Sequence, residues 1–410
     1  MPVNAIITDI EGTTTDIQFV HKVLFPYAAK VLPSFILEHQ QTEHIALIIG
    51  QVKALINDQL ASTDKVIETL LQWMADDKKI TPLKTLQGYI WKAAYEKGDF
   101  TGHIYADASF WLTQWHNEGL PLYVYSSGSE QAQRLLYQYS DKGDLSTLFS
   151  GYFDTKIGAK KDSKSYQRIC QAINCPPQDV LFLSDINEEL DAATAAGLQT
   201  ALVARDNNPV SKHPRASQFA EINLLINNAS SQLCVYHEED ALTPLLFSQS
   251  LTEISKELDR IGVQFRRWPA HKTLARDTDN ENILNTYKQE IDKLVKQEGY
   301  ACVDVVSINP DTPNKAAIRQ KFLSEHTHDD DEVRFFVRGA GLFFLHAEEK
   351  IYVIYCQRND LINVPKKMKH WFDMGENPSF TCIRLFNDPK GWEARYTGDP
   401  LANNFPHLIK

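Results

Sequence analysis

The 410-residue sequence predicts two domains: a doubly wound parallel α/β sheet with a helical cap, then an all-β antiparallel barrel with a few helices. The chain is longer than one hydrophobic core usually serves. In the first half, short apolar runs that end on polar residues alternate with helical segments. From Tyr300 on, β-rich runs separated by turns dominate, as is typical of a barrel. We expect the domains at 1–226 and 233–410, with a small, polar linker at 227–232.

Composition limits the function classes. With 43% hydrophobic and 23% charged residues, the chain is ordinary globular protein. A net charge of −11 argues against nucleic acid or an anionic membrane as partner. No apolar run reaches the ~18 residues of a membrane span, and the N-terminus lacks a signal-peptide pattern. Six cysteines without paired spacing predict reduced thiols in a cytoplasmic protein. We also expect a monomer.

The first strand delivers two acids. The run 5–8 is apolar and ends on Asp9, and Glu11 and Gly12 follow closely. Open α/β sheets bind ligands at the carboxyl ends of their strands. Asp9 and Glu11 can therefore address one site if the backbone turns at Gly12. Taken alone, a strand-terminal aspartate could equally be a structural cap.

A helical insertion follows at 17–118, where apolar residues recur at spacings of three and four. Roughly 100 helical residues between two sheet strands predict a cap that excludes water from the site.

The sheet resumes at 120–125 and ends on Ser126 and Ser127, just before a helix. Hydroxyls and free amides at such a junction form a plausible phosphate cradle. Further along the chain, Lys160 is the candidate lysine of this site, and Lys161 is the alternative.

The next apolar run, 180–184, ends on a further acid, Asp185, and 201–204 is the fourth strand. Two acids, serines, a lysine and an aspartate at successive strand ends form a constellation for phosphoryl transfer through an aspartyl phosphate.

This arrangement resembles the haloacid-dehalogenase superfamily over about residues 1 to 225. The segments Asp-Ile-Glu-Gly-Thr-Thr-Thr-Asp-Ile, Tyr-Ser-Ser-Gly-Ser and Asp-Thr-Lys-Ile-Gly-Ala-Lys resemble the enolase-phosphatases of methionine salvage more closely. The resemblance implies that 2,3-diketo-5-methylthiopentyl-1-phosphate is enolised and dephosphorylated to an acireductone. A general phosphatase of sugar phosphates or nucleotides, or a metal-free dehalogenase, remains the alternative.

Charge dictates the chemistry of such a site. A phosphate dianion repels a carboxylate, so Mg²⁺ is expected between them, held by Asp9, Asp185 and the main-chain carbonyl of Glu11. Asp9 is the expected nucleophile, and Glu11 the acid that protonates the leaving group and then activates water. Three further residues are expected to bind the phosphoryl oxygens: Ser126, Ser127 and Lys160.

A second chemical pattern lies near the end of the chain. His326, His328 and Glu332 have the same parity, so on an extended strand they share one face. His370, from a later segment, offers a fourth ligand. Imidazole and carboxylate together suit divalent iron, nickel, manganese or zinc. The alternative is a polar loop with solvated histidines. We expect the strand to begin near Asp331, after a turn of acids.

The spacing His-x-His-x3-Glu-x6-Gly resembles the first cupin motif, and 365–370 resembles the second. Over about residues 232 to 400 the sequence resembles acireductone dioxygenase, on the segments Glu-His-Thr-His-Asp-Asp-Asp-Glu-Val-Arg-Phe-Phe and Lys-His-Trp-Phe-Asp-Met-Gly. Three positions that are not ligands depart from the general cupin pattern: Gln320, Lys367 and Met374.

This second resemblance implies Fe²⁺ or Ni²⁺ as the metal, and acireductone and O₂ as substrates. Iron is expected to give formate and 2-keto-4-methylthiobutyrate, and nickel to give carbon monoxide and a shorter acid. Arg334 and Arg384 are candidates to hold the substrate's oxygens, or else form structural ion pairs. Phe322, Phe372 and Trp392 are candidate walls for its tail, or core residues. A cupin that only binds a ligand is the alternative to a dioxygenase.

Overall fold

The computed structural model describes residues 2–78, 80–205, 210–268, 274–388 and 393–409. The chain divides into two compact units, Met1–Phe219 and Ala220–Lys410. The expected linker at 227–232 lies inside the second unit, so the proposed domain limits stay a prediction. Within the described residues, no helix combines the length and apolar character that a membrane crossing requires.

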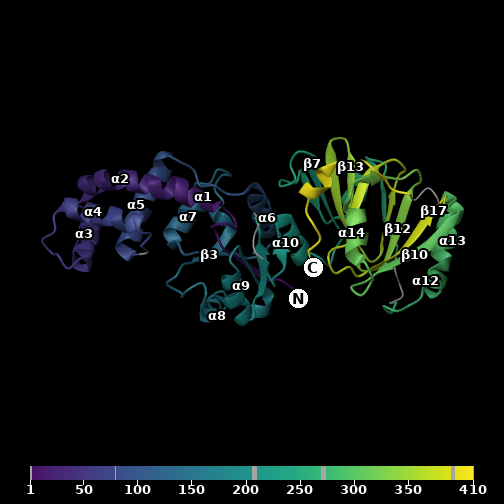
Figure 1. The fold of residues 1–410 in the computed structure, drawn as a ribbon, viewed down its shortest axis with the longest axis horizontal. Helices are drawn as coiled ribbons and strands as arrows, with labels where there is room; N and C mark the ends of the chain where they lie inside the picture. The colour runs from purple at the N-terminus through teal and green to yellow at the C-terminus, as the bar shows by residue number, and fades with distance from the viewer. Residues whose placement is uncertain (1, 79, 206–209, 269–273, 389–392, 410) are drawn as a thin grey trace. The chain divides into compact units, whose positions relative to one another are not determined.

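The first unit contains a six-stranded sheet with the order β3-β2-β1-β4-β5-β6, of which Figure 1 labels β3. All its pairings are parallel. The strands are β1 (Ala5–Thr8), β2 (Leu122–Tyr125), β3 (Phe149–Phe153), β4 (Val180–Ser184), β5 (Gln199–Val203) and β6 (Arg215–Ala216). The chain builds outward from β1 to β3 and then returns to β4 on the other side of β1. A crevice is therefore expected at the carboxyl ends of β1 and β4.

Two groups of helices accompany this sheet. Four follow or precede its strands: α6 (Ala106–Asn117), α7 (Glu130–Gln138), α8 (Ser163–Ala172) and α9 (Asn187–Ala195). The cap consists of α1 (Ile17–Phe19), the π-helical turn η1 (Val20–Leu24), α2 (Phe25–His39), α3 (Glu43–Leu55), α4 (Thr63–Ala75) and α5 (Thr81–Lys97). The cap has its own core, with Leu32, Val52, Leu70 and Ile90 buried together. Because α6 instead contacts β2, the cap's own helices end before the expected limit of 118.

The second unit contains two antiparallel sheets, with the orders β10-β17-β12-β15-β9 and β18-β11-β16-β13-β14-β7-β8. Their strands are β7 (Gln232–His237), β8 (Leu246–Ser248), β9 (Gln264–Arg267), β10 (Cys302–Ile308), β11 (His326–Thr327), β12 (Glu332–Arg338), β13 (Ala340–Ala347), β14 (Lys350–Gln357), β15 (Asp360–Val364), β16 (Lys369–Asp373), β17 (Phe380–Phe386) and β18 (Arg395–Tyr396). Phe336 and Phe380 from one sheet pack with Phe343 and Phe372 from the other in a shared core.

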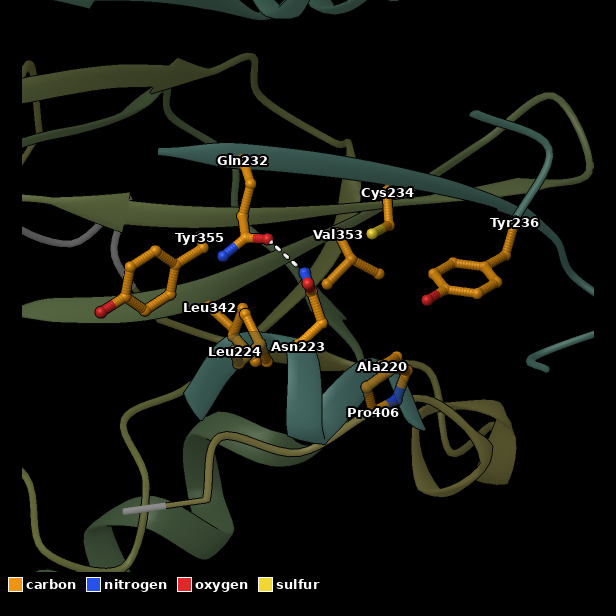
Figure 2. Close-up of a pocket in the computed structure, with 10 residues that line it drawn as sticks. All are labelled: Ala220, Asn223, Leu224, Gln232, Cys234, Tyr236, Leu342, Val353, Tyr355 and Pro406. Carbon is orange, nitrogen blue, oxygen red and sulfur yellow. Dashed lines mark hydrogen bonds between the residues drawn. The ribbon is translucent and has the colours of Figure 1, made fainter. Parts of the chain in front are cut away.

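Helices cover these sheets, two of them against the shared core and three on the outer faces together with the end of the chain. The helices are α10 (Phe219–Ile226), α11 (Leu251–Asp259), α12 (Asn280–Thr286), α13 (Lys288–Glu298) and α14 (Lys315–Leu323). Figure 2 shows a small pocket between α10 and the strands β7, β13 and β14, where Asn223 donates to Gln232 over 2.8 Å. The lining of this pocket is mostly apolar and includes none of the predicted site residues.

The segment 326–332 differs from the single extended strand assumed for its parity. His326 lies in β11 of the seven-stranded sheet, whereas Glu332 begins β12 of the five-stranded sheet. The acids between them form a turn, in which Asp330 accepts hydrogen bonds from the amides of Asp331 and Asn387. The turn was expected, but the change of sheet was not.

Candidate active sites

Asp9 directly follows β1 and is buried, with 3% of its surface exposed. The loop after it turns at Gly12, whose φ of +73° is left-handed. A Cβ at Gly12 would lie 2.2 Å from Oδ2 of Asp185, so glycine is needed for both the turn and the close approach. The carboxyl ends of β1 and β4 thus bring Asp9 and Asp185 to one place.

Lys160 joins this group as an ion-pair partner. Its Nζ lies 2.6 Å from Oδ1 of Asp9 and 2.7 Å from Oε2 of Glu189. Lys161, the alternative in the sequence, is exposed and 4.0 Å from Glu188. Geometry therefore favours Lys160 as the lysine of the site.

Ser126 connects the site to the end of β2. It is fully buried, and its hydroxyl donates to Oε2 of Glu11 over 3.0 Å. The main-chain carbonyl of Ser127 accepts a hydrogen bond from Lys84 of the cap. The structure therefore gathers Asp9, Glu11, Ser126 and Asp185 as expected, and it adds a contact from the cap.

Burial and like charge perturb these acids. The pKa of Glu11 is raised by burial and by the nearby charge of Asp9. The same two causes raise the pKa of Asp185 to about 7. Burial lowers the pKa of Lys160, but Asp9 and Glu189 outweigh it and hold that pKa above its usual value. The acids retain protons easily, while the lysine stays charged.

The donor set fits a magnesium ion. Oδ1 of Asp185 is buried and has no hydrogen-bond partner among the described residues. An orphaned buried carboxylate oxygen is costly unless a cation or water satisfies it. Asp9, Asp185 and the carbonyl of Glu11 offer only hard oxygen donors, which Mg²⁺ prefers.

The second site is a cluster of buried imidazoles. His326, His328 and His370 each offer a nitrogen, and these three atoms lie within 4.8 Å of one another. Strand pairing places His326 directly opposite His370. Oε2 of Glu332 lies 2.9 Å from Nε2 of His370 and 3.3 Å from Nε2 of His328. The four predicted ligands therefore converge, with the histidines forming the compact set.

Main-chain carbonyls orient these rings. Nδ1 of His326 lies 2.7 Å from the carbonyl of Ser324, and Nδ1 of His370 lies 2.8 Å from that of Met368. A ring that donates from Nδ1 presents the lone pair of Nε2 to a metal. Burial, followed by the charge of His370, lowers the pKa of His326 to about 4. A neutral imidazole is the form that binds a metal, so the set fits divalent iron or nickel.

Arg334 is buried beside the cluster, and its Nε hydrogen-bonds to Oε1 of Glu332. Burial raises the pKa of Glu332, but Arg334, His328 and His370 together outweigh it and hold that pKa well below the usual range. Three aromatic rings surround the guanidinium at 5.3–5.7 Å: Phe322, Phe343 and Phe372. Arg334 thus lies beside Glu332, one of the four predicted metal ligands.

Arg384 has a different environment. It lies opposite Arg334 on the neighbouring strand, and its Nε is 2.7 Å from Oδ1 of Asp304. This ion pair favours the structural role that the sequence left open. Trp392, the third candidate wall, lies outside the described residues.

Sequence reasoning missed several groups in these sites. Glu189, on the first turn of α9, was not singled out, although it lies one helical turn after Asp185. Glu325, just before His326, is buried and accepts from His346 over 2.7 Å. Glu325 opens the segment that resembles acireductone dioxygenase, but the sequence predicted no function for it. The signal that could have identified Glu189 and Glu325 is their spacing, because each is a charged residue within four positions of a predicted ligand.

Comparison with known proteins finds separate matches for the N-terminal and the C-terminal half of the chain. Residues 3–197 match the family model of haloacid dehalogenase-like hydrolases, and residues 233–394 match that of the ARD/ARD' family. An enolase-phosphatase E1 of Pseudomonas syringae pv. syringae is 51% identical over 223 residues, which cover 54% of this chain and 98% of the relative. The enolase-phosphatase E1 of Alcanivorax borkumensis is 52% identical and 99% covered, again over 54% of this chain.

Two solved structures are each similar to part of the chain. The UTR4 protein of Saccharomyces cerevisiae is 33% identical with a TM-score of 0.47, covering 53% of this chain and 98% of that one. An acireductone dioxygenase from Bacillus anthracis, with a cadmium ion in its active centre, is 29% identical with a TM-score of 0.37. It covers 41% of this chain, and 99% of that chain is covered.

Proposed function

The chain belongs to the enolase-phosphatase family in its N-terminal half and carries an ARD/ARD' family domain in its C-terminal half, and from this premise we propose that it catalyses two consecutive steps of methionine salvage. It is a bifunctional enzyme, a hydrolase joined to a dioxygenase. The first half enolises and dephosphorylates 2,3-diketo-5-methylthiopentyl-1-phosphate. The second half oxidises the resulting acireductone with O₂.

In the first half, Asp9 attacks the phosphorus in line with the leaving oxygen. Bound Mg²⁺ supplies the positive charge that lets a carboxylate approach a phosphate dianion. Lys160 keeps Asp9 oriented and neutralises phosphoryl oxygens. Glu11, whose raised pKa favours its acid form, protonates the leaving oxygen and afterwards takes a proton from the water that cleaves the aspartyl phosphate. Ser126 holds the carboxyl of Glu11 in place.

In the second half, His326, His328, Glu332 and His370 would hold a divalent metal, which would supply the redox chemistry for the reaction of acireductone with O₂. Arg334 donates charge-assisted hydrogen bonds to the anionic oxygens of the substrate. The rings of Phe322 and Phe372 exclude water around that guanidinium. With iron we expect formate and 2-keto-4-methylthiobutyrate, and with nickel methylthiopropionate, formate and carbon monoxide.

One observation supports this assignment most strongly: each unit holds a buried cluster of ionisable groups, and the two clusters differ in their donors. The cluster around Asp9 offers carboxylate oxygens and an ammonium. The cluster around His326 offers imidazole nitrogens beside a carboxylate. The first donor set suits Mg²⁺ and phosphoryl transfer, whereas the second suits a metal that handles oxygen.

The test adds the phosphorylated diketone to the full-length protein with Mg²⁺ and without air, followed by a pulse of oxygen. We expect phosphate release first, oxygen uptake only after the pulse, and iron or nickel on elemental analysis. Phosphate release that survives EDTA would exclude the first assignment. An acireductone that accumulates without consuming oxygen would exclude the second and favour a cupin that only binds a ligand. Light scattering checks the expected monomer.

A further inference from the structure

Lys84 of the cap helix α5 reaches the loop between β2 and α7. Its Nζ donates to the main-chain carbonyl of Ser127 over 3.1 Å. Ser127 directly follows Ser126, which holds the carboxyl of Glu11. Helices α5 and α7 pack against each other, so this part of the cap lies against the start of α7 (Figure 1). A cationic side chain from the cap therefore stands at the edge of the phosphate-binding loop.

The charge of Lys84 is balanced differently from that of the other lysines in α5. Lys92 pairs with Glu96, and Lys97 lies 3.2 Å from a carboxylate oxygen of Asp99. Lys84 is half-buried, and no carboxylate of the described residues lies within 4.0 Å of its ammonium. A partly buried ammonium loses hydration, and a carbonyl compensates it less well than an anion does. An anionic ligand at this position would restore the balance.

The rest of the site has more carboxyl groups than cationic side chains. Lys160 already contacts two carboxylates, those of Asp9 and Glu189, at 2.6 and 2.7 Å. Glu11 and Asp185 add two further carboxyl groups to the site. A phosphate dianion adds two negative charges to those of Asp9, Asp185 and Glu189, whereas Lys160 and one divalent cation together supply three positive charges. A second ammonium beside the phosphate-binding loop would reduce the remaining excess of negative charge.

We propose that Lys84 is a further substrate-binding residue, which donates from the cap to a phosphoryl oxygen of the substrate. This inference rests on the function proposed for the first half. An ammonium has three N–H donors, and the hydrogen bond to Ser127 uses one of them. Binding of the phosphate then also ties the cap to the loop after β2, which couples substrate recognition to the exclusion of water.

The experiment compares three variants of the full-length protein in the presence of Mg²⁺. Lys84→Met removes the charge and keeps an apolar stem, Lys84→Arg keeps the charge, and Lys92→Met is the matched control on the same helix. Calorimetry measures the Kd for inorganic phosphate, and phosphate release gives the KM for the phosphorylated diketone. Loss of one hydrogen bond to a charged group should raise both constants about 10- to 100-fold in Lys84→Met. Lys84→Arg should recover most of the loss, and Lys92→Met should match the wild type.

An unchanged Kd for phosphate in Lys84→Met would overturn the proposal, even if turnover of the diketone fell. So would a Lys84→Arg variant that regains the wild-type unfolding temperature without regaining phosphate binding, because the lysine would then be structural. The phosphate titration does not depend on turnover. Wild-type protein that binds phosphate yet releases none from the diketone would therefore refute the proposed function and leave Lys84 to be judged by its own titration.

Discussion

The carboxylate cluster of the first unit and the histidine cluster of the second differ in the charge that their own residues carry. Asp9, Glu11, Asp185 and Glu189 surround a single ammonium, that of Lys160. The second cluster consists of three imidazoles, which carry no negative charge, and one carboxylate, which is paired with Arg334. The first cluster is thus strongly anionic, whereas the second is nearly balanced.

This difference explains the opposite pKa shifts. In the first cluster, burial and mutual repulsion raise the pKa of Asp185 and of Glu11, so protons compete with a cation. In the second, burial lowers the pKa of His326 and so favours the form that binds metal. The comparison teaches that a site for a hard cation depends on pH in the neutral range, while a buried imidazole site can remain ready for its metal over a wider range.

The largest expected effect separates the two activities. Asp9→Asn removes the nucleophile and should lower phosphate release by on the order of 10⁴- to 10⁶-fold, as losses of catalytic nucleophiles do. Oxygen uptake on added acireductone should not change, because no residue of the second cluster is altered. Both rates are measured on one preparation. A variant that loses both activities would break the comparison, since the clusters would not be independent.

The converse change is His370→Ala. It removes a ligand that lies opposite His326, and the metal affinity of the second cluster should fall by more than about 100-fold, beyond the usual effect of an outer-shell residue. Elemental analysis and oxygen uptake measure the loss. Phosphate release is the internal control, and His237→Gln is the matched histidine variant in the same unit. Retention of the full metal content in His370→Ala would contradict the assignment.

Much of the fold could be predicted from sequence because short apolar runs ended on polar residues and alternated with helical segments. The strands β1, β2, β4 and β5 were all recognised in this way. The strand β3 was not, because its sequence Phe-Ser-Gly-Tyr-Phe mixes polar and small residues at the edge of the sheet. Such a strand is set by its pairing with β2 and not by its own apolar pattern.

The site shows a similar limit. Motif spacing identified residues that cluster in the structure, such as Asp9 and His326. It did not identify Glu189 or Lys84, which approach the site only because α9 and α5 pack where they do. Parity placed His326, His328 and Glu332 on one strand face, although the chain there crosses from one sheet to the other. Spacing reports local geometry, whereas charge balance depends on tertiary contacts.

A smaller effect follows from acidity. Mg²⁺ requires the ionised form of Asp185, whose pKa burial and Asp9 raise to about 7. Below that pKa the proton is bound, so the apparent Mg²⁺ affinity should fall about tenfold per pH unit. The pKa of His326 is about 4, so His326 should stay in the form that binds a metal over the same range. Mg²⁺ titrations between about pH 8 and about pH 6 test this difference, and an affinity that does not change with pH would contradict it.

The smallest expected effect tests how the second cluster is supported. Glu325 is buried directly before His326, and its carboxylate accepts from His346 over 2.7 Å and from Thr397 over 2.9 Å. Glu325→Gln keeps the size of the side chain but removes the charge that pairs with His346. Because Glu325 acts on His326 through the main chain and not by direct contact with a metal, the loss of metal affinity should be about tenfold, the lower end for outer-shell partners. Competition with a chelator measures that affinity, and phosphate release should stay at the wild-type rate. A loss as large as that of His370→Ala would mean that the position of β11 depends on this one buried charge.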